Sequence, residues 1–95
     1  MQYQISGIHI NIGDALQNYV KDELNEAINK YAERPTDAQI IFSKSGHEFV
    51  CDAIIHLSTG LTAQAKASKA EIYAAFNACA EKMEKQLRRY KRKLK

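Results

Sequence analysis

Residues 68–95 have the sequence SKAEIYAAFNACAEKMEKQLRRYKRKLK, which contains neither proline nor glycine. Ser68 and Glu71 have the spacing of a capping box, in which the serine oxygen accepts from an amide of the first turn and the glutamate reaches back. The pattern predicts a helix from residue 69 to residue 95, roughly 40 Å long at about 1.5 Å per residue. The apolar residues recur at spacings of three or four, as in a helix that lies on a core: Ile72, Phe76, Cys79, Met83, Leu87, Tyr90 and Leu94.

The second half of this predicted helix is strongly basic. Residues 82–95 hold eight basic residues and one acidic residue, whereas residues 1–81 hold six basic and ten acidic residues. The formal net charge of +3 therefore hides a positive end and a weakly negative body. This polarity predicts that the protein turns its basic end toward a polyanion.

Length and composition predict one globular domain. Of the 95 residues, 45% are hydrophobic and 26% are charged, which is enough for one core and too little for two. The N-terminal residues lack the basic segment and the apolar run of a signal peptide, and no apolar stretch has the length of a membrane span. The expected compartment is the cytoplasm, where Cys51 and Cys79 would be reduced thiols.

A strand and a second helix are predicted before the middle of the chain. Residues 2–12 alternate as a strand if one residue is inserted near Ser6 and Gly7, where a glycine is expected at a bulge. Residues 14–33 carry another helical stripe. This helix is expected to begin after Gly13 as its N-cap and to end before a proline.

Three short strands with turns between them follow. Residues 38–43 are β-branched and aromatic, and residues 49–57 and 61–68 alternate between two faces. Turns are predicted at residues 44–47 and 58–60. Two helices need one apolar sheet face to cover, so the fold class is predicted as α+β. The architecture is a two-layer β-α-β-β-β-α sandwich, a four-stranded sheet with two helices on one face.

The basic half of the last helix is the strongest functional signal. Rows of cations on a rigid rod match the spacing of phosphates and bind through counterion release. The alternative is a solvated face whose cations suit a helix C-terminus, but this needs only one or two cations, and eight repel each other. The cations fall on two flanks of the apolar stripe. One flank carries Lys82, Lys85, Arg89, Arg92 and Lys93, and the other carries Arg88, Lys91 and Lys95.

Other candidate sites have weaker support. Tyr73 and Tyr90 could stack on bases, but both adjoin the apolar stripe and are expected in the core or at its edge. The predicted outer face of the sheet has no aromatic pair, which argues against the stacking platform of an RNA-recognition motif. The three histidines lack metal-ligand spacing, and Cys51 and Cys79 are expected to be buried free thiols. No catalytic or cofactor motif is present, so neither an enzyme nor a cofactor is predicted.

Two segments of the predicted C-terminal helix carry a family resemblance. EIYAAFN at residues 71–77 and KMEKQL at residues 82–87, followed by the basic tail, resemble the signature helix of the bacterial ribosome hibernation promoting factors, the ribosome-associated inhibitor and sigma-54 modulation protein family. MQYQISG at residues 1–7 and the strand at residues 50–57, with its Asp-Ala pair, are also similar to that family. The resemblance covers essentially the whole chain.

The resemblance implies a β-α-β-β-β-α fold, similar to a double-stranded-RNA-binding domain, and a specific function. Members of the family lodge between head and body of the small ribosomal subunit, where they contact 16S rRNA and block messenger RNA and the A- and P-site tRNAs in stationary phase or stress. Residues 1–95 would be a single ribosome-binding domain without the C-terminal dimerisation domain, monomeric off the ribosome. Members of this short type promote 100S ribosome dimers together with ribosome modulation factor.

The resemblance also implies which residues contact rRNA. Family members often place basic residues on the first helix, whereas this chain has Glu23 and Glu26 there, so a contact from that helix stays open. Two alternatives also remain: a general duplex-RNA-binding module, and a protein-interaction subunit that docks its basic helix on an acidic partner. The expected rRNA-binding residues are Lys82, Lys85, Arg88 and Arg89, followed by Lys91, Arg92 and Lys93.

Overall fold

The four strands and two helices form two layers. The computed structural model describes residues 2–31, 35–57, 60 and 62–93. Along the chain, the elements are β1 (Gln2–Gly7), α1 (Asp14–Tyr31), β2 (Pro35–Ser45), β3 (Glu48–Leu57), β4 (Thr62–Lys69) and α2 (Ile72–Lys93). The strands form one sheet in the order β1-β2-β3-β4, in which β1 and β2 are parallel and the other neighbours antiparallel.

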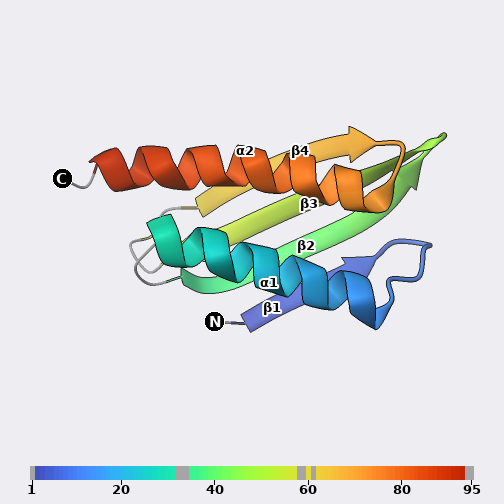
Figure 1. The fold of residues 1–95 in the computed structure, drawn as a ribbon, viewed down its shortest axis with the longest axis horizontal. Coiled ribbons are helices and arrows are strands. Elements are labelled where there is room, and N and C mark those ends of the chain that lie inside the picture. The colour runs from blue at the N-terminus through green and yellow to red at the C-terminus, as the bar shows by residue number, and fades with distance from the viewer. Residues whose placement is uncertain (1, 32–34, 58–59, 61, 94–95) are drawn as a thin grey trace.

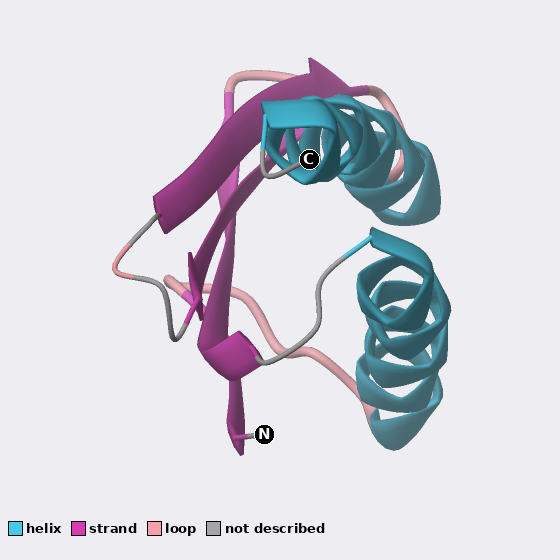
Figure 2. Cartoon of the chain, turned by 90° about the vertical axis from the view of Figure 1, so that its left-hand side faces the viewer, coloured by secondary structure: helices cyan, strands magenta, loops and turns pink. Residues whose placement is uncertain are grey.

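Both helices cover the same face of the sheet, and the other face is left open (Figure 2). α1 is the crossover between the parallel strands β1 and β2, and α2 lies along β4 and β3 (Figure 1). The domain is elongated, with extents of 42 × 20 × 19 Å. The predicted α+β sandwich with two helices on one face is therefore confirmed.

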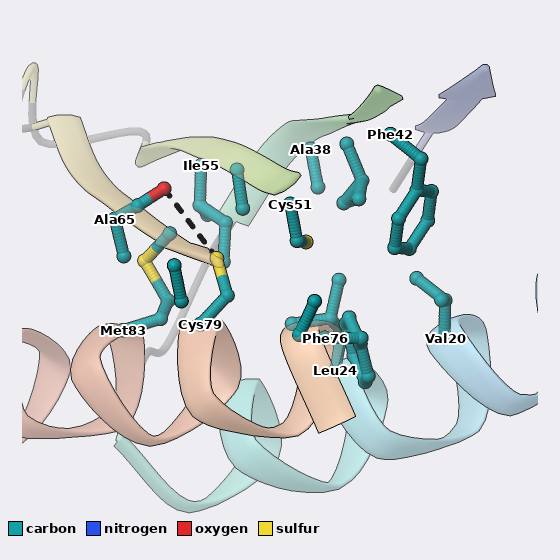
Figure 3. Close-up of a cluster of buried hydrophobic side chains, with 14 of the residues drawn as sticks. Val20, Leu24, Ala38, Phe42, Cys51, Ile55, Ala65, Phe76, Cys79 and Met83 are labelled. Carbon is teal, nitrogen blue, oxygen red and sulfur yellow. Dashed lines mark hydrogen bonds between the residues drawn. The ribbon is translucent and has the colours of Figure 1, made fainter. Parts of the chain in front are cut away.

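The core lies between the sheet and the two helices (Figure 3). Strand alternation supplies one side of it, since the three alanines of β4 are buried while the residues between them are exposed. Phe76 is fully buried, with its ring centroid 6.5 Å from that of Phe42 and 5.7 Å from that of Tyr19. Small side chains on β4 let α2 approach closely. The predicted apolar stripe of α2 is buried at Phe76, Cys79, Met83 and Leu87.

The predicted strand over residues 2–12 is wrong in its second half. β1 ends at Gly7, and the chain then leaves the sheet instead of forming a bulge. The amide of Ile8 still donates to the carbonyl of Phe42 at 2.8 Å, and His9 has a φ of 60°. The change of alternation near Gly7 therefore marks the end of the strand, because a left-handed residue two positions later turns the chain toward α1.

The predicted capping box at Ser68 is also wrong. Ser68 and Lys69 belong to β4, where they pair with Val50 and Phe49 of β3. α2 begins at Ile72, and the amide of Ala75 donates to the carbonyl of Glu71 at 2.9 Å. Glu71 is therefore the N-cap residue. Pairing with β3 outweighs the local capping pattern, because it extends a ladder that is already formed.

Most other predicted boundaries hold within a few residues. The amide of Gln17 donates to the carbonyl of Gly13 at 3.2 Å, which confirms the start of α1. β2 is longer than its predicted range of 38–43. The predicted end of the first helix, the turn residues 58–59 and the first residue of the last strand, Leu61, lie outside the described residues.

Gly7 is predicted to tolerate no side chain. A Cβ atom at this position would lie 2.5 Å from the backbone oxygen of Ile10. Replacing Gly7 with alanine should therefore force the β1–α1 connection to move and lower the free energy of unfolding by about 1–3 kcal/mol, measured by urea denaturation. Ser6→Ala, at the exposed neighbouring position, is the control and should change it by less than about 0.5 kcal/mol. Equal values for the two variants would contradict this reading of the turn.

Candidate nucleic-acid interface

The cations of α2 are arranged around its buried stripe. Lys82, Lys85 and Arg89 are exposed and line the flank that faces β4. Arg88 lies on the other flank, where one of its guanidinium nitrogens is 3.9 Å from a carboxylate oxygen of Glu84. The helical period thus separates the predicted site residues into two rows, and the row beside β4 has two lysines of the strand, Lys66 and Lys69, next to it.

A groove of about 510 Å³ runs between β4 and α2. Lys66 and Lys69 come from the strand, Lys82 and Lys85 from the helix, and Glu81 is the acidic residue in its lining. A second hollow, which shares Lys82 and Lys85 with the first, continues along α2 toward Arg89. We call this continuous surface, lined by Lys66, Lys69, Lys82, Lys85 and Arg89, the basic groove.

The sequence did not predict that Lys66 and Lys69 of β4 line the basic groove. The alternation of Lys66 with the buried alanines of β4 places it on the outer face of the sheet. What brings it beside α2 is the position of β4 at the edge of the sheet. Strand order is not visible in the alternation of a single strand. Lys69, which was predicted to start the helix, instead ends β4.

Two side chains of α2 hold the helix against this strand edge. The amide of Gln64 donates to Oε1 of Gln86 at 3.0 Å, and Nε2 of Gln86 donates to the carbonyl of Gln64. Nζ of Lys82 donates to the carbonyl of Lys66 at 2.9 Å. Gln86 therefore bonds to β4 as a neighbouring strand would, and it fixes the distance between the two walls of the basic groove.

Replacing Gln86 with glutamate should loosen this attachment. A carboxylate cannot donate to the carbonyl of Gln64 and would repel it, so we expect the free energy of unfolding to fall by about 1–2 kcal/mol. The readout is thermal unfolding, with an expected decrease of roughly 4–16 °C in Tm. Gln39→Glu makes the same chemical change on the open face of the sheet and serves as the control. An equal decrease in both variants would contradict the role given to Gln86.

The structure describes part of the predicted site. It brings Lys82, Lys85 and Arg89 together and leaves Arg88 on the opposite flank. Lys91, Arg92 and Lys93 end α2, but their side chains are outside those described. On α1, Glu23 and Glu26 are exposed, as are Lys21 and Lys30. The first helix therefore offers a mixed surface instead of a row of cations.

The aromatic residues weighed as stacking platforms lie elsewhere. Tyr73 is 40% exposed, and its ring packs edge-on against Tyr19 with centroids 5.1 Å apart. The hydroxyl of Tyr19 donates to Oδ1 of Asn77 at 2.6 Å. Tyr73 thus lies at the edge of the core, as predicted, on the α1 side of α2 and away from the basic groove. The side chain of Tyr90 is not among those described.

The two cysteines are free and buried, as predicted. The thiol of Cys79 donates to the carbonyl of Ala65 at 3.4 Å (Figure 3). A hydrogen bond to Cys79 and burial together raise the pKa of the Cys51 thiol far above its ordinary value. The Cys51 thiol is therefore a neutral packing group, whereas the hydrogen bond with Cys51 lowers the pKa of the Cys79 thiol. Within the described ranges, no three histidine, cysteine or acidic side chains are grouped to hold a metal ion.

Fold and site together define a class: a small α+β domain with one sheet, two helices on one face and a cationic groove along its edge. Residues 3–95 match the family described as "Sigma 54 modulation protein / S30EA ribosomal protein". The chain belongs to this family, which confirms the resemblance found in its C-terminal helix. None of the helices in the described part of the chain combines the length and the apolar character needed to cross a membrane.

Several named proteins are similar to this chain. The ribosome hibernation promotion factor of Rhizobium meliloti (strain 1021) is 40% identical over 95 residues, which are 100% of this chain and 50% of that protein. The ribosome hibernation promoting factor of Azotobacter vinelandii is 31% identical over 93 residues, 98% of this chain and 85% of that protein. This chain thus spans about half the length of the Rhizobium relative.

A solved structure has the same fold. The ribosomal subunit interface protein from Coxiella burnetii superposes with a TM-score of 0.84 at 25% sequence identity, covering 96% of this chain and 98% of that one. The likeness extends over every element of the two-layer fold. The β4–α2 arrangement that forms the basic groove is therefore part of the common architecture.

Proposed function

We propose that this protein is a ribosome hibernation factor that binds 16S rRNA in the decoding channel of the small subunit. The observation that carries the proposal is the basic groove. Five cations from two rigid elements line it, with Glu81 as the acidic residue among them. The relatives named as hibernation factors support the same function.

Binding of this kind is sterically inhibitory. A rigid domain 42 Å long in the decoding channel occupies space that messenger RNA and the A- and P-site tRNAs need. Contacts to phosphates fix position and orientation but carry little sequence information. Specificity then comes from the shape of the rRNA pocket, into which a two-layer domain of fixed outline fits. No catalytic step is required for this mechanism.

The proposal extends to ribosome dimers. Like the family members described above, this protein would promote 100S particles together with ribosome modulation factor in the cytoplasm during stationary phase or stress. Its proposed partner is the 30S subunit within the 70S ribosome. Off the ribosome, the protein would be a monomer. A 100S peak in a sucrose gradient, present only when both factors are added, tests this part.

Co-sedimentation with purified 70S ribosomes across a salt series tests the central claim. If six to ten phosphates are contacted, affinity should fall roughly 10³–10⁵-fold between about 50 and 200 mM salt. Messenger RNA and initiator tRNA should displace the bound protein. Failure to bind at low salt would refute the proposal.

Two other outcomes would identify the alternatives. Equal affinity for free RNA duplex and for 30S subunits would indicate a general duplex-RNA-binding module, because the shape of the assembled subunit would then contribute nothing. Association with ribosomal particles that resists ribonuclease would indicate a protein-interaction subunit. Both comparisons use the same purified protein and the same gradients.

A further inference from the structure

We infer that the free edge of β4 forms a phosphate-binding subsite within the basic groove. Its donors are the backbone N–H groups of Lys66 and Ser68, together with the ammonium groups of Lys66, Lys69 and Lys82. The inference rests on the proposed function for the source of the phosphate, which is an RNA backbone. It adds main-chain donors of β4 to the side-chain cations that line the basic groove.

The orientation of the β4 backbone follows from its hydrogen bonds. β4 is the last strand of the sheet and pairs with β3 on one side. In an antiparallel pair, alternate residues point both backbone groups toward the partner and the others point them away. Gln64 and Lys66 use outward-pointing groups to bond Gln86 and Lys82. By the same period of two, the N–H and C=O of Ser68 point outward as well.

This outward edge is only partly covered. Gln86 takes both backbone groups of Gln64, and Lys82 takes the carbonyl of Lys66. Among the hydrogen bonds of the described residues, none uses the N–H of Lys66 or Ser68 in this direction. Both donors are located at the wall of the groove that Lys66, Ser68 and Lys69 line. The uncovered edge of a sheet is a known anion-binding concavity.

The surroundings of these donors suit a phosphate. Ser68 and Lys69 are exposed on the strand, and Lys82 stands across the groove on α2. Ala67, Ser68 and Ala78 are small, so the groove stays open above the strand edge. A phosphate oxygen could therefore reach a main-chain N–H while its charge is neutralised by lysines on both walls.

Exposed strand edges also carry lysines simply to prevent pairing with other strands. That role requires the charge of Lys66 and Lys69 but makes no use of the Ser68 N–H. The two roles therefore differ in their dependence on a main-chain donor, and a variant that removes only this donor separates them.

The first measurement is an amide chemical-shift titration of the wild-type protein with a 12-base-pair RNA duplex at low salt. We expect the Lys66 and Ser68 amides to show shifts among the largest in the domain. The amides of Lys21 and Glu23, on the exposed face of α1, give the reference level for non-specific effects. Shifts at Lys66 and Ser68 no larger than this reference would overturn the inference.

The second measurement compares Ser68→Pro with Ser68→Ala. Proline removes the N–H at an outward-pointing position of an edge strand, where the sheet ladder stays intact; alanine removes only the hydroxyl. Loss of a hydrogen bond to a charged acceptor should weaken duplex binding about tenfold in Ser68→Pro, and Ser68→Ala should stay within about twofold. Equal affinities for the two variants would count against the subsite. Circular dichroism verifies the fold of each.

Charge-neutral variants keep the inference falsifiable if the proline variant does not fold. The double variant Lys66→Gln, Lys69→Gln should lower the slope of log K against log salt by about 1.5, because two phosphate contacts are lost. Lys21→Gln on α1 should leave the slope unchanged. A double variant that keeps the wild-type slope would overturn the subsite.

The same set separates this inference from the proposed function. A wild-type protein that shifts its Lys66 and Ser68 amides with duplex RNA but does not co-sediment with ribosomes would refute the function and retain the subsite. A protein that co-sediments in a salt-dependent way, with neither the amide shifts nor the change of slope, would retain the function and refute the subsite.

Discussion

Replacing Lys82, Lys85 and Arg89 together with glutamate is expected to abolish ribosome association. At about 0.1 M salt, each phosphate contact contributes roughly tenfold to affinity through counterion release. Loss of three contacts should therefore lower affinity about 10³-fold, and three new negative charges in the groove should lower it further. Co-sedimentation with 70S ribosomes at about 50 mM salt provides the measurement.

Two controls make this result specific. Lys21→Glu, Lys30→Glu and Lys44→Glu, combined in one protein, change the net charge by the same amount outside the basic groove and should retain most of the binding. Glutamate at position 82 also loses the bond from Nζ to the carbonyl of Lys66, at a cost of about 1 kcal/mol. Thermal unfolding must therefore show that the triple variant is folded. Wild-type binding by a folded triple variant would refute the site.

Replacing Phe76 with alanine is expected to have the largest effect on stability. Phe76 is fully buried, and its ring packs near the rings of Phe42 and Tyr19. Truncation of a buried phenylalanine costs about 3–5 kcal/mol, and a domain of this kind has a total stability of about 5–15 kcal/mol. Urea denaturation should show the loss, and ribosome binding should decrease at 37 °C as the folded fraction falls.

Tyr73→Ala is the matched control for this prediction. Tyr73 lies one turn earlier on α2, is 40% exposed and contacts Tyr19 edge-on. Losing its ring should cost about 0.5–1.5 kcal/mol. If both variants lose the same free energy of unfolding, Phe76 would not be the anchor of α2 that its burial indicates.

The sequence predicts the periodic features of this fold well. The stripe of α2 has a strict spacing and is buried from Phe76 to Leu87. The alternation in β3 and β4 likewise identifies their inward residues correctly. Such patterns are set by one element against one core, so each can be read without knowing its neighbours.

Features that depend on neighbouring elements could not be predicted in this way. Ser68 has the local pattern of a helix cap, yet it pairs with Val50 because β4 runs on beside β3. Lys66 and Lys69 join the basic groove only because β4 is the edge strand next to α2. The helix side of the basic groove was therefore predictable, because charge is dense there, and the strand side was not, because its lysines are separated by alternation.

The bond from Lys82 to the strand has a consequence for the energetics of recognition. A free lysine loses rotamer entropy when a ligand immobilises it, at about 0.5–1.5 kcal/mol per side chain. Lys82 has already lost part of that freedom, since its ammonium group is held by the carbonyl of Lys66 while two N–H donors remain. Among the described cations of the groove, Lys82 is thus preorganised. We expect an approaching polyanion to bind Lys82 before it orders the other side chains.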